Sequence, residues 1–194
     1  EMCIRDSVTG EFYVGGLVGK IENKTIIKNC YASSSVTGKD YVGGLVGDQN
    51  NTTTVVNSYA TGSVTGELYV GGLVGALGGE DGDKEGGKIL YSYASGSVNG
   101  KKKVGGLVGG IIDSFGPATI AYSRWNTETT GQTNGVSNVN SGTINNLKGL
   151  TTSQFADSSN FRGFDTSIWD FSGKMPTLKN VGLVKENVST KALE

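Results

Sequence analysis

One heptapeptide recurs along this chain and constrains its fold more than any other feature. YVGGLVG occurs at residues 13–19, 41–47 and 69–75, and KVGGLVG at 103–109, so the copies are spaced by 28, 28 and 34 residues. Short β-prone runs alternate with turn formers, and no helical period of apolar residues persists in the repeats. A single 28-residue unit buries too little apolar surface to offset its conformational entropy. The repeats therefore predict a solenoid in which each unit stacks on the next.

Stacking places equivalent residues of successive rungs about 4.8 Å apart, as in paired strands. We expect the valine and leucine columns, including Val18 and its equivalents, to form the core. Tyrosines are expected to stack in two columns, headed by Tyr13 and Tyr31. We expect the paired glycines to turn a corner with positive φ. The predicted structural positions are Val14, Gly15, Gly16, Leu17, Val42, Gly43, Gly44, Leu45, Val70, Gly71, Gly72, Leu73, Val104, Gly105, Gly106 and Leu107.

Composition excludes several classes of function. The net charge of −1 lacks the basic surface that nucleic acid or an anionic membrane requires, and no window is long and apolar enough to span a bilayer. The chain contains no histidine, which removes Ser-His-Asp and Cys-His machinery and argues against zinc. Cys30 occupies the position of Ser58, Ser92 and Ser123 and is expected to be a small stacked residue rather than a reactive thiol.

The motif VGGLVG, preceded by N-(C/S)-Y-A and G-S-V-T-G, resembles the GLUG repeat of large bacterial surface and secreted proteins. The resemblance covers residues 7–132 and implies an all-β fold: a right-handed parallel β-helix, or β-solenoid, of about four to five rungs with a C-terminal cap. Members include adhesin-like proteins and repeat regions attached to zinc peptidases that cleave immunoglobulins. It implies an extracellular or surface location and a structural or adhesive role without catalysis. It carries no catalytic residues to this chain.

The sequence divides into four parts. Residues 1–6 do not match the repeats, and MCIRDS is similar to a translated transposase end, so we expect a non-native leader. Residues 7–132 are the repeats, 133–182 a capping segment and 183–194 a tail or linker, and we expect the whole to be part of a longer chain. Thr151 and Gln154 have capping-box spacing. Five aromatic residues follow and are expected to cover the solenoid end: Phe155, Phe161, Phe164, Trp169 and Phe171.

Two kinds of site are candidates for binding. Asp81, Asp83 and Glu85, followed by a glycine, resemble the first half of a calcium loop, although Ser92 stands where the bidentate glutamate is needed. Calcium is the one cofactor considered, and a solvated acidic loop is the alternative.

The charged turns at Lys39, Glu67 and Lys101, together with the loop from Gly78 to Lys88, are expected to meet an extracellular glycan or protein partner. A carbohydrate-active β-helix, whether lyase, hydrolase or glycan-binding module, is the alternative function. Charged side chains that converge in one groove would favour this carbohydrate-active alternative. A threonine column headed by Thr9 suggests an ice-binding face, but no second column is expected beside it.

Overall fold

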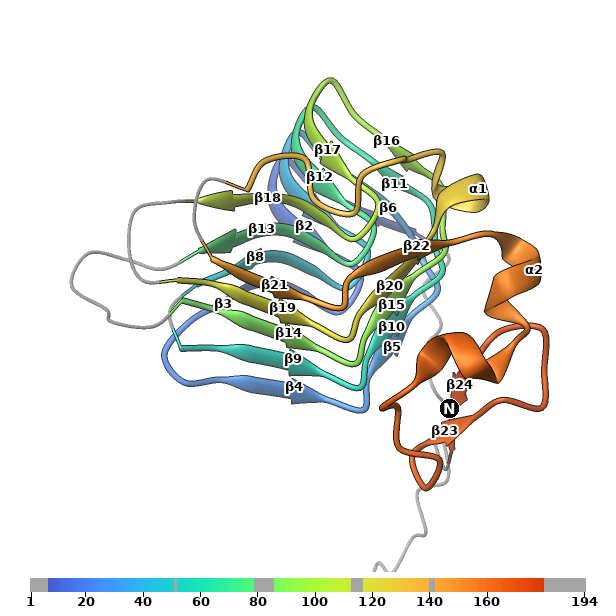
Figure 1. Ribbon diagram of the computed structural model, residues 1–194. Helices are drawn as coiled ribbons and strands as arrows, with labels where there is room; N and C mark the ends of the chain where they lie inside the picture. Colours follow the sequence, from blue (N-terminus) through green and yellow to red (C-terminus); the bar gives the residue numbers. More distant parts are fainter. Residues whose placement is uncertain (1–6, 51, 79–85, 113–116, 140–141, 180–194) are drawn as a thin grey trace, which may run out of the picture.

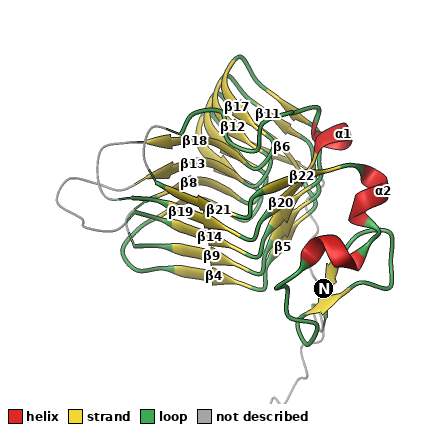
Figure 2. Cartoon of the chain, viewed as in Figure 1, coloured by secondary structure: helices red, strands yellow, loops and turns green. Residues whose placement is uncertain are grey.

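The chain folds into a parallel β-solenoid of about five turns, as the repeats predict (Figure 1). This computed structural model describes residues 7–50, 52–78, 86–112, 117–139 and 142–179. Strands dominate it, and the short helices lie in the C-terminal part (Figure 2). Each complete rung contributes one strand to each of five sheets, A to E, and all pairing within these sheets is parallel.

The strands of each sheet are as follows. Sheet A contains β1 (Ser7–Thr9), β6 (Ser35–Thr37), β11 (Val64–Thr65) and β16 (Val98–Asn99). Sheet B contains β2 (Phe12–Gly15), β7 (Asp40–Gly43), β12 (Leu68–Gly71) and β17 (Lys102–Gly105). Sheet C contains β3 (Val18–Ile21), β8 (Val46–Gln49), β13 (Val74–Gly78) and β18 (Val108–Ile112). Sheet D contains β4 (Ile26–Lys28), β9 (Thr54–Val56), β14 (Lys88–Leu90), β19 (Thr119–Ala121) and β21 (Thr143–Asn145). Sheet E contains β5 (Tyr31–Ala32), β10 (Tyr59–Ala60), β15 (Tyr93–Ala94), β20 (Arg124–Asn126) and β22 (Lys148–Leu150).

The strand register follows the sequence repeat. Val42 pairs with Val14 on one side and Val70 on the other. The insertion in the third interval lies between β13 and β14, because those strands keep the repeat register on both sides of it. The solenoid also continues beyond the expected boundary at residue 132, since β21 pairs with β19 and β22 with β20. Residues 142–150 therefore belong to a fifth rung rather than to the capping segment.

The core has two lobes. One contains the valines of sheets A and B, and the other contains the apolar residues of sheets C and D, the leucines of the later VGGLVG copies, and the alanines and Trp125 of sheet E. Leu45, Leu73 and Leu107 are fully buried, as predicted, but Leu17 in the first rung is 48% exposed. The valines between sheets A and B are buried in the middle rungs, whereas Val104 in the fourth rung is only half-buried. Burial is thus most complete in the middle rungs, although Val14, Ile21 and Ile27 of the first rung are also buried.

A wall of glycine separates the two lobes. A Cβ added to Gly47 would lie 2.6 Å from the backbone nitrogen of Val14, and one added to Gly75 would lie 2.6 Å from that of Val42. These contacts are closer than Cβ atoms tolerate, so sheets B and C meet backbone to backbone. The last glycine of VGGLVG is therefore needed for this approach.

The prediction that the paired glycines take positive φ is wrong. The positive-φ residue is the one before each VGGLVG, and φ is 58° at Tyr41 and 54° at Lys103. Gly43 and Gly44 are instead required by close packing, because a Cβ on Gly44 would lie 2.2 Å from the carbonyl oxygen of Gly72. The left-handed conformation costs about 1–2 kcal/mol for a residue with a Cβ. A second left-handed column marks the turn between sheets D and E and comprises Asn29, Asn57, Tyr91, Tyr122 and Asn146.

The C-terminal segment covers a side of the solenoid and not its end. It contains α2 (Thr152–Phe155), the 3-10 helix η1 (Ser158–Phe161) and the antiparallel pair β23 (Trp169–Asp170) and β24 (Thr177–Leu178). The expected capping box is present, with Thr151 as N-cap. The predicted aromatic cluster is formed, but it packs against the tyrosines of sheet E (Figure 1). This position corrects the expectation of an end cap.

Two polar anchors fix this segment to sheet E. The Tyr93 hydroxyl donates to the carbonyl oxygen of Pro176 at 2.5 Å. Arg124, which takes the next place in the tyrosine column, donates from Nε to the carbonyl oxygen of Asn160 at 2.8 Å. Burial lowers the pKa of the Arg124 guanidinium. Its hydrogen bonds to main-chain oxygens satisfy a buried group that would otherwise be costly.

Trp125 fills the core near the last rung. It aligns with Ala94 in the column of small residues that begins at Ala32. Its indole nitrogen donates to the carbonyl oxygen of Gln132 at 2.9 Å, within the turn that follows helix α1 (Thr127–Thr130). The indole ring of Trp125 therefore fills core space near the last rung that an alanine at this position would leave empty.

Candidate binding surface

Oppositely charged side chains alternate along the turn between sheets A and B. The Lys39 ammonium lies 2.7 Å from the Glu11 carboxylate, and the Lys101 ammonium lies 2.8 Å from that of Glu67. Each hydrogen bond, aided by the opposite charge, lowers the pKa of its glutamate, and Glu11 likewise raises the pKa of Lys39. All four groups are solvent-exposed, so the pairs add little stability. The predicted charged turns thus pair with one another along the solenoid axis.

A groove lies beside this ladder and is lined by Asp40, Glu67, Leu68, Lys101 and Lys102. Among them, Leu68 pairs in register with Asp40 on one neighbouring rung and Lys102 on the other. Residues from three rungs therefore line this groove.

The main chain holds the walls of the groove in position. The carbonyl oxygen of Lys39 accepts hydrogen bonds from the backbone nitrogens of Glu67 and Leu68, at 2.7 and 3.1 Å. One rung further on, the carbonyl oxygen of Glu67 accepts from those of Lys101 and Lys102, at 3.1 and 2.8 Å. Because each turn is fixed to the next, the main-chain positions of these residues have a fixed spacing along the solenoid.

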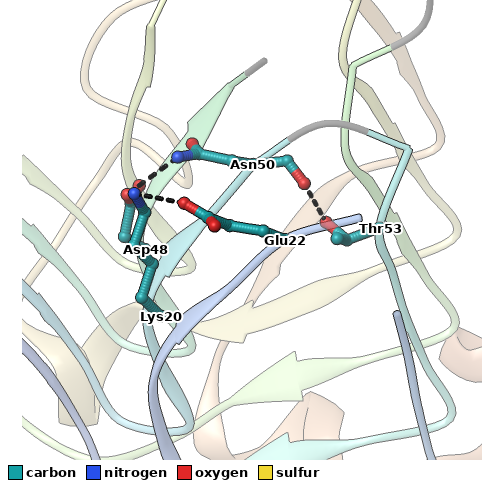
Figure 3. Close-up of polar contacts among 5 residues, drawn as sticks. All are labelled: Lys20, Glu22, Asp48, Asn50 and Thr53. Atoms are coloured by element: carbon teal, nitrogen blue, oxygen red, sulfur yellow. Dashed lines mark hydrogen bonds and ion pairs between the residues drawn. The ribbon is translucent and has the colours of Figure 1, made fainter. Parts of the chain in front are cut away.

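A second polar cluster lies at the end of strands β3 and β8 (Figure 3). Lys20 forms an ion pair with Glu22, which raises the pKa of Lys20, and Lys20 aligns in register with Asp48. The Asn50 amide donates to the Asp48 carboxylate at 3.2 Å, while the Thr53 hydroxyl donates to the Asn50 carbonyl oxygen at 2.7 Å (Figure 3). These bonds shape the turn into β9. Sequence reasoning missed the cluster because its members differ from rung to rung.

Serine hydroxyls link the rungs at the turn between sheets D and E. The backbone nitrogen of Ser58 donates to the Ser92 hydroxyl at 3.1 Å, and that of Cys30 donates to the Ser58 hydroxyl at 3.2 Å. The Cys30 thiol occupies the same column and donates to the Lys28 carbonyl oxygen at 3.3 Å. Burial raises the pKa of this thiol, which opposes reactivity. The register places Cys30 where the alignment predicted a small stacked residue.

Both predicted tyrosine columns are present. Tyr13, Tyr41 and Tyr69 stack with ring centroids 4.9 and 5.3 Å apart, and the Lys20 ammonium lies 5.4 Å from the centroid of the Tyr13 ring. The column headed by Tyr31 is also stacked, but the C-terminal segment covers it. Stacking contributes about 0.5–1.5 kcal/mol per pair, which helps to offset the left-handed backbone at the first column.

The outer face of sheet A carries hydroxyl groups in two columns. Thr9, Thr37 and Thr65 align in register, and Asn99 ends that column, as expected. A serine column runs beside it, contrary to expectation, and Ser63 donates to Ser35 at 2.9 Å. In the first three rungs a valine stands between the serine and the threonine and points inward, with Val36 and Val64 buried and Val8 half-buried, which leaves the two hydroxyl columns outside.

The predicted calcium residues Asp81, Asp83 and Glu85 lie outside the described residues. Ser92, the position that departs from the calcium-loop pattern, is fully buried, and its hydroxyl donates to the Leu90 carbonyl oxygen at 2.7 Å. Within the described part of the chain, no three histidine, cysteine or acidic side chains are grouped to hold a metal ion. In the same ranges, no helix is long and apolar enough to cross a membrane.

The fold and its surface define a repeat solenoid with a ladder of charged turns. The model of the GLUG motif matches residues 10–37 and 66–99, so these two parts of the solenoid contain the GLUG motif. No curated protein matches the chain. Among solved structures, it is similar to a putative immunoglobulin A1 protease from Bacteroides ovatus, with a TM-score of 0.65 and 17% identity. That likeness covers 87% of this chain and 64% of the other, and it shows a shared fold.

Proposed function

We propose that this chain is a structural or adhesive repeat module of a secreted or cell-surface bacterial protein, which provides reach or attachment rather than catalysis. The observation that carries the proposal is the cross-rung pairing of the charged turns, Glu11 with Lys39 and Glu67 with Lys101. Main-chain hydrogen bonds fix each turn to the next, so the stack presents these side chains at a regular spacing. The GLUG repeats and the fold of the Bacteroides ovatus protein support a module of a secreted protein.

The groove on sheet B gives the carbohydrate-active alternative a specific basis. It brings two carboxyl groups, Asp40 and Glu67, to one place. Glycoside hydrolysis requires a carboxylic acid with a raised pKa as proton donor, but Lys101 lowers the pKa of Glu67. The surroundings of Glu67 thus favour binding over hydrolysis.

A binding array tests the proposal. The full chain would be applied to immobilised glycans and extracellular proteins, with calcium and then with a chelator. Saturable binding to a defined glycan or protein supports attachment, and binding lost with the chelator supports calcium at Asp81, Asp83 and Glu85. If the chain binds neither the glycans nor the proteins, with calcium or with the chelator, attachment is contradicted and only the spacer role remains. Glycan cleavage by the purified chain would overturn the assignment to a non-catalytic module.

A further inference from the structure

The groove beside the charge ladder has the chemistry of a sugar site. An apolar side chain, Leu68, lies in register between a carboxylate, Asp40, and an ammonium, Lys102. A carboxylate accepts hydrogen bonds from hydroxyl groups, whereas an ammonium donates to them. An apolar side chain between such groups suits a pyranose ring, which has hydroxyls on its rim and C–H bonds on its faces.

The spacing of the flanking groups matches one ring. Asp40 and Lys102 occupy one column, two rungs apart, with Leu68 between them. At about 4.8 Å per rung, their main-chain positions are roughly 10 Å apart, a span that one pyranose ring lying over Leu68 can bridge with a hydrogen bond at each end. The paired Glu67 and Lys101 stand along the rim of the groove and offer further polar partners.

The net charge of the groove favours an uncharged ligand over a polyanion. Its five lining residues contain two carboxylates and two ammonium groups, so they carry no net charge. A surface of this kind does not concentrate polyanions such as sulfated glycans or nucleic acids. A neutral sugar needs no such attraction, because its hydroxyls bond to groups of either charge.

We propose that the groove formed by Asp40, Leu68 and Lys102, with Glu67 and Lys101 at its rim, binds a neutral pyranose residue of a glycan. The inference rests on the attachment role proposed above and assigns it to one surface. The groove is open and small, so a single sugar binds weakly, with Kd on the order of 1 mM. Attachment then depends on several contacts to one polymer or on several chains.

The test is a titration of the full chain, labelled with nitrogen-15, monitored at its backbone amides by NMR. The probes are methyl glycosides of glucose, galactose, mannose, N-acetylglucosamine and fucose, and the tripeptide Lys-Leu-Glu as a peptide of mixed charge. We expect at least one glycoside to shift the amides of Glu67, Leu68 and Lys102 saturably. Raising the salt concentration changes its affinity by less than about twofold, because the sugar is uncharged.

Variants separate the groove from the rest of the surface. Asp40→Ala and Lys102→Ala each remove a charged hydrogen-bonding partner and are expected to weaken glycoside binding about tenfold. Lys148→Ala changes an exposed lysine of sheet E and is expected to leave affinity within about twofold. The thermal midpoint of each variant, measured by circular dichroism, confirms that it is folded.

Two outcomes overturn the inference. The first is that no glycoside shifts these amides, whether or not the tripeptide shifts them. The second is that the glycoside shifts survive both Asp40→Ala and Lys102→Ala. If the chain still binds an immobilised glycan or protein after both substitutions, attachment stands and the groove is wrong. If it binds nothing on the array, the attachment role itself fails.

Discussion

The leucine column offers a test of stacking with a control inside the same column. Leu45 is fully buried in the second rung, whereas Leu17, its equivalent in the first rung, is 48% exposed. Replacing leucine with alanine removes three carbons, and each buried carbon contributes about 0.8 kcal/mol, or about 2.4 kcal/mol for Leu45. A cavity between rungs adds to this, so we expect Leu45→Ala to lower the free energy of unfolding by about 3–4 kcal/mol.

Leu17→Ala loses about half of the transfer contribution and leaves no enclosed cavity, so about 1 kcal/mol is expected. Urea denaturation of both variants, followed by circular dichroism, gives the free energies and their slopes. The reasoning is refuted if the two substitutions cost the same, or if Leu45→Ala costs less than about 0.5 kcal/mol. Either result would mean that burial between two rungs does not determine the contribution of this column.

Three further results are expected. Gly44→Ala places a Cβ 2.2 Å from a neighbouring carbonyl oxygen, so the yield of soluble folded protein should fall sharply. The control Lys39→Ala should fold normally, and equal yields of the two variants would contradict the glycine packing. Burial raises the pKa of Tyr59 to about 12, above its unfolded value of about 10. The stability contributed by the protonated Tyr59 phenol is therefore complete below pH 10, and it is lost as the pH rises toward 12 because the unfolded chain ionises first. The urea midpoint should therefore fall less over that range in Tyr59→Phe than in the unchanged chain, and an identical fall would reject the shift. In a Cys3→Ser background, Cys30 should react with a thiol reagent at neutral pH more slowly in the folded chain than in urea, and similar rates would show an accessible thiolate.

The period of the sequence predicted most of the fold, because identical residues at a fixed spacing become columns once rungs stack. The tyrosine stacks and the leucine column follow directly from the alignment, whereas the capping box follows from the local spacing of Thr151 and Gln154. The glycine prediction was wrong for a physical reason. Glycine permits both positive φ and close backbone contact, and the sequence does not distinguish these uses. The structure assigns positive φ to Tyr41 and contact to Gly44.

The candidate site was only partly predictable. Glu67 and Lys101 were identified as exposed charged turns, but their mutual pairing and the position of Asp40 depend on which rung faces which. The C-terminal segment was predicted to pack its aromatic residues together, yet the pattern does not say which surface receives them. The side of sheet E receives them because its tyrosines offer apolar rings, and because Arg124 and Tyr93 bond to the segment's carbonyl oxygens.

The parallel register has a mechanical consequence. Hydrogen bonds in the five stacked sheets run along the solenoid axis, so tension applied along that axis pulls on all the sheets between two rungs at once. A rung resists as a unit and then detaches as a unit, and each 28-residue repeat that is released adds up to roughly 95 Å of extended chain. Under flow, such a stack would lengthen in discrete steps and dissipate load, while the rungs that remain keep their shape.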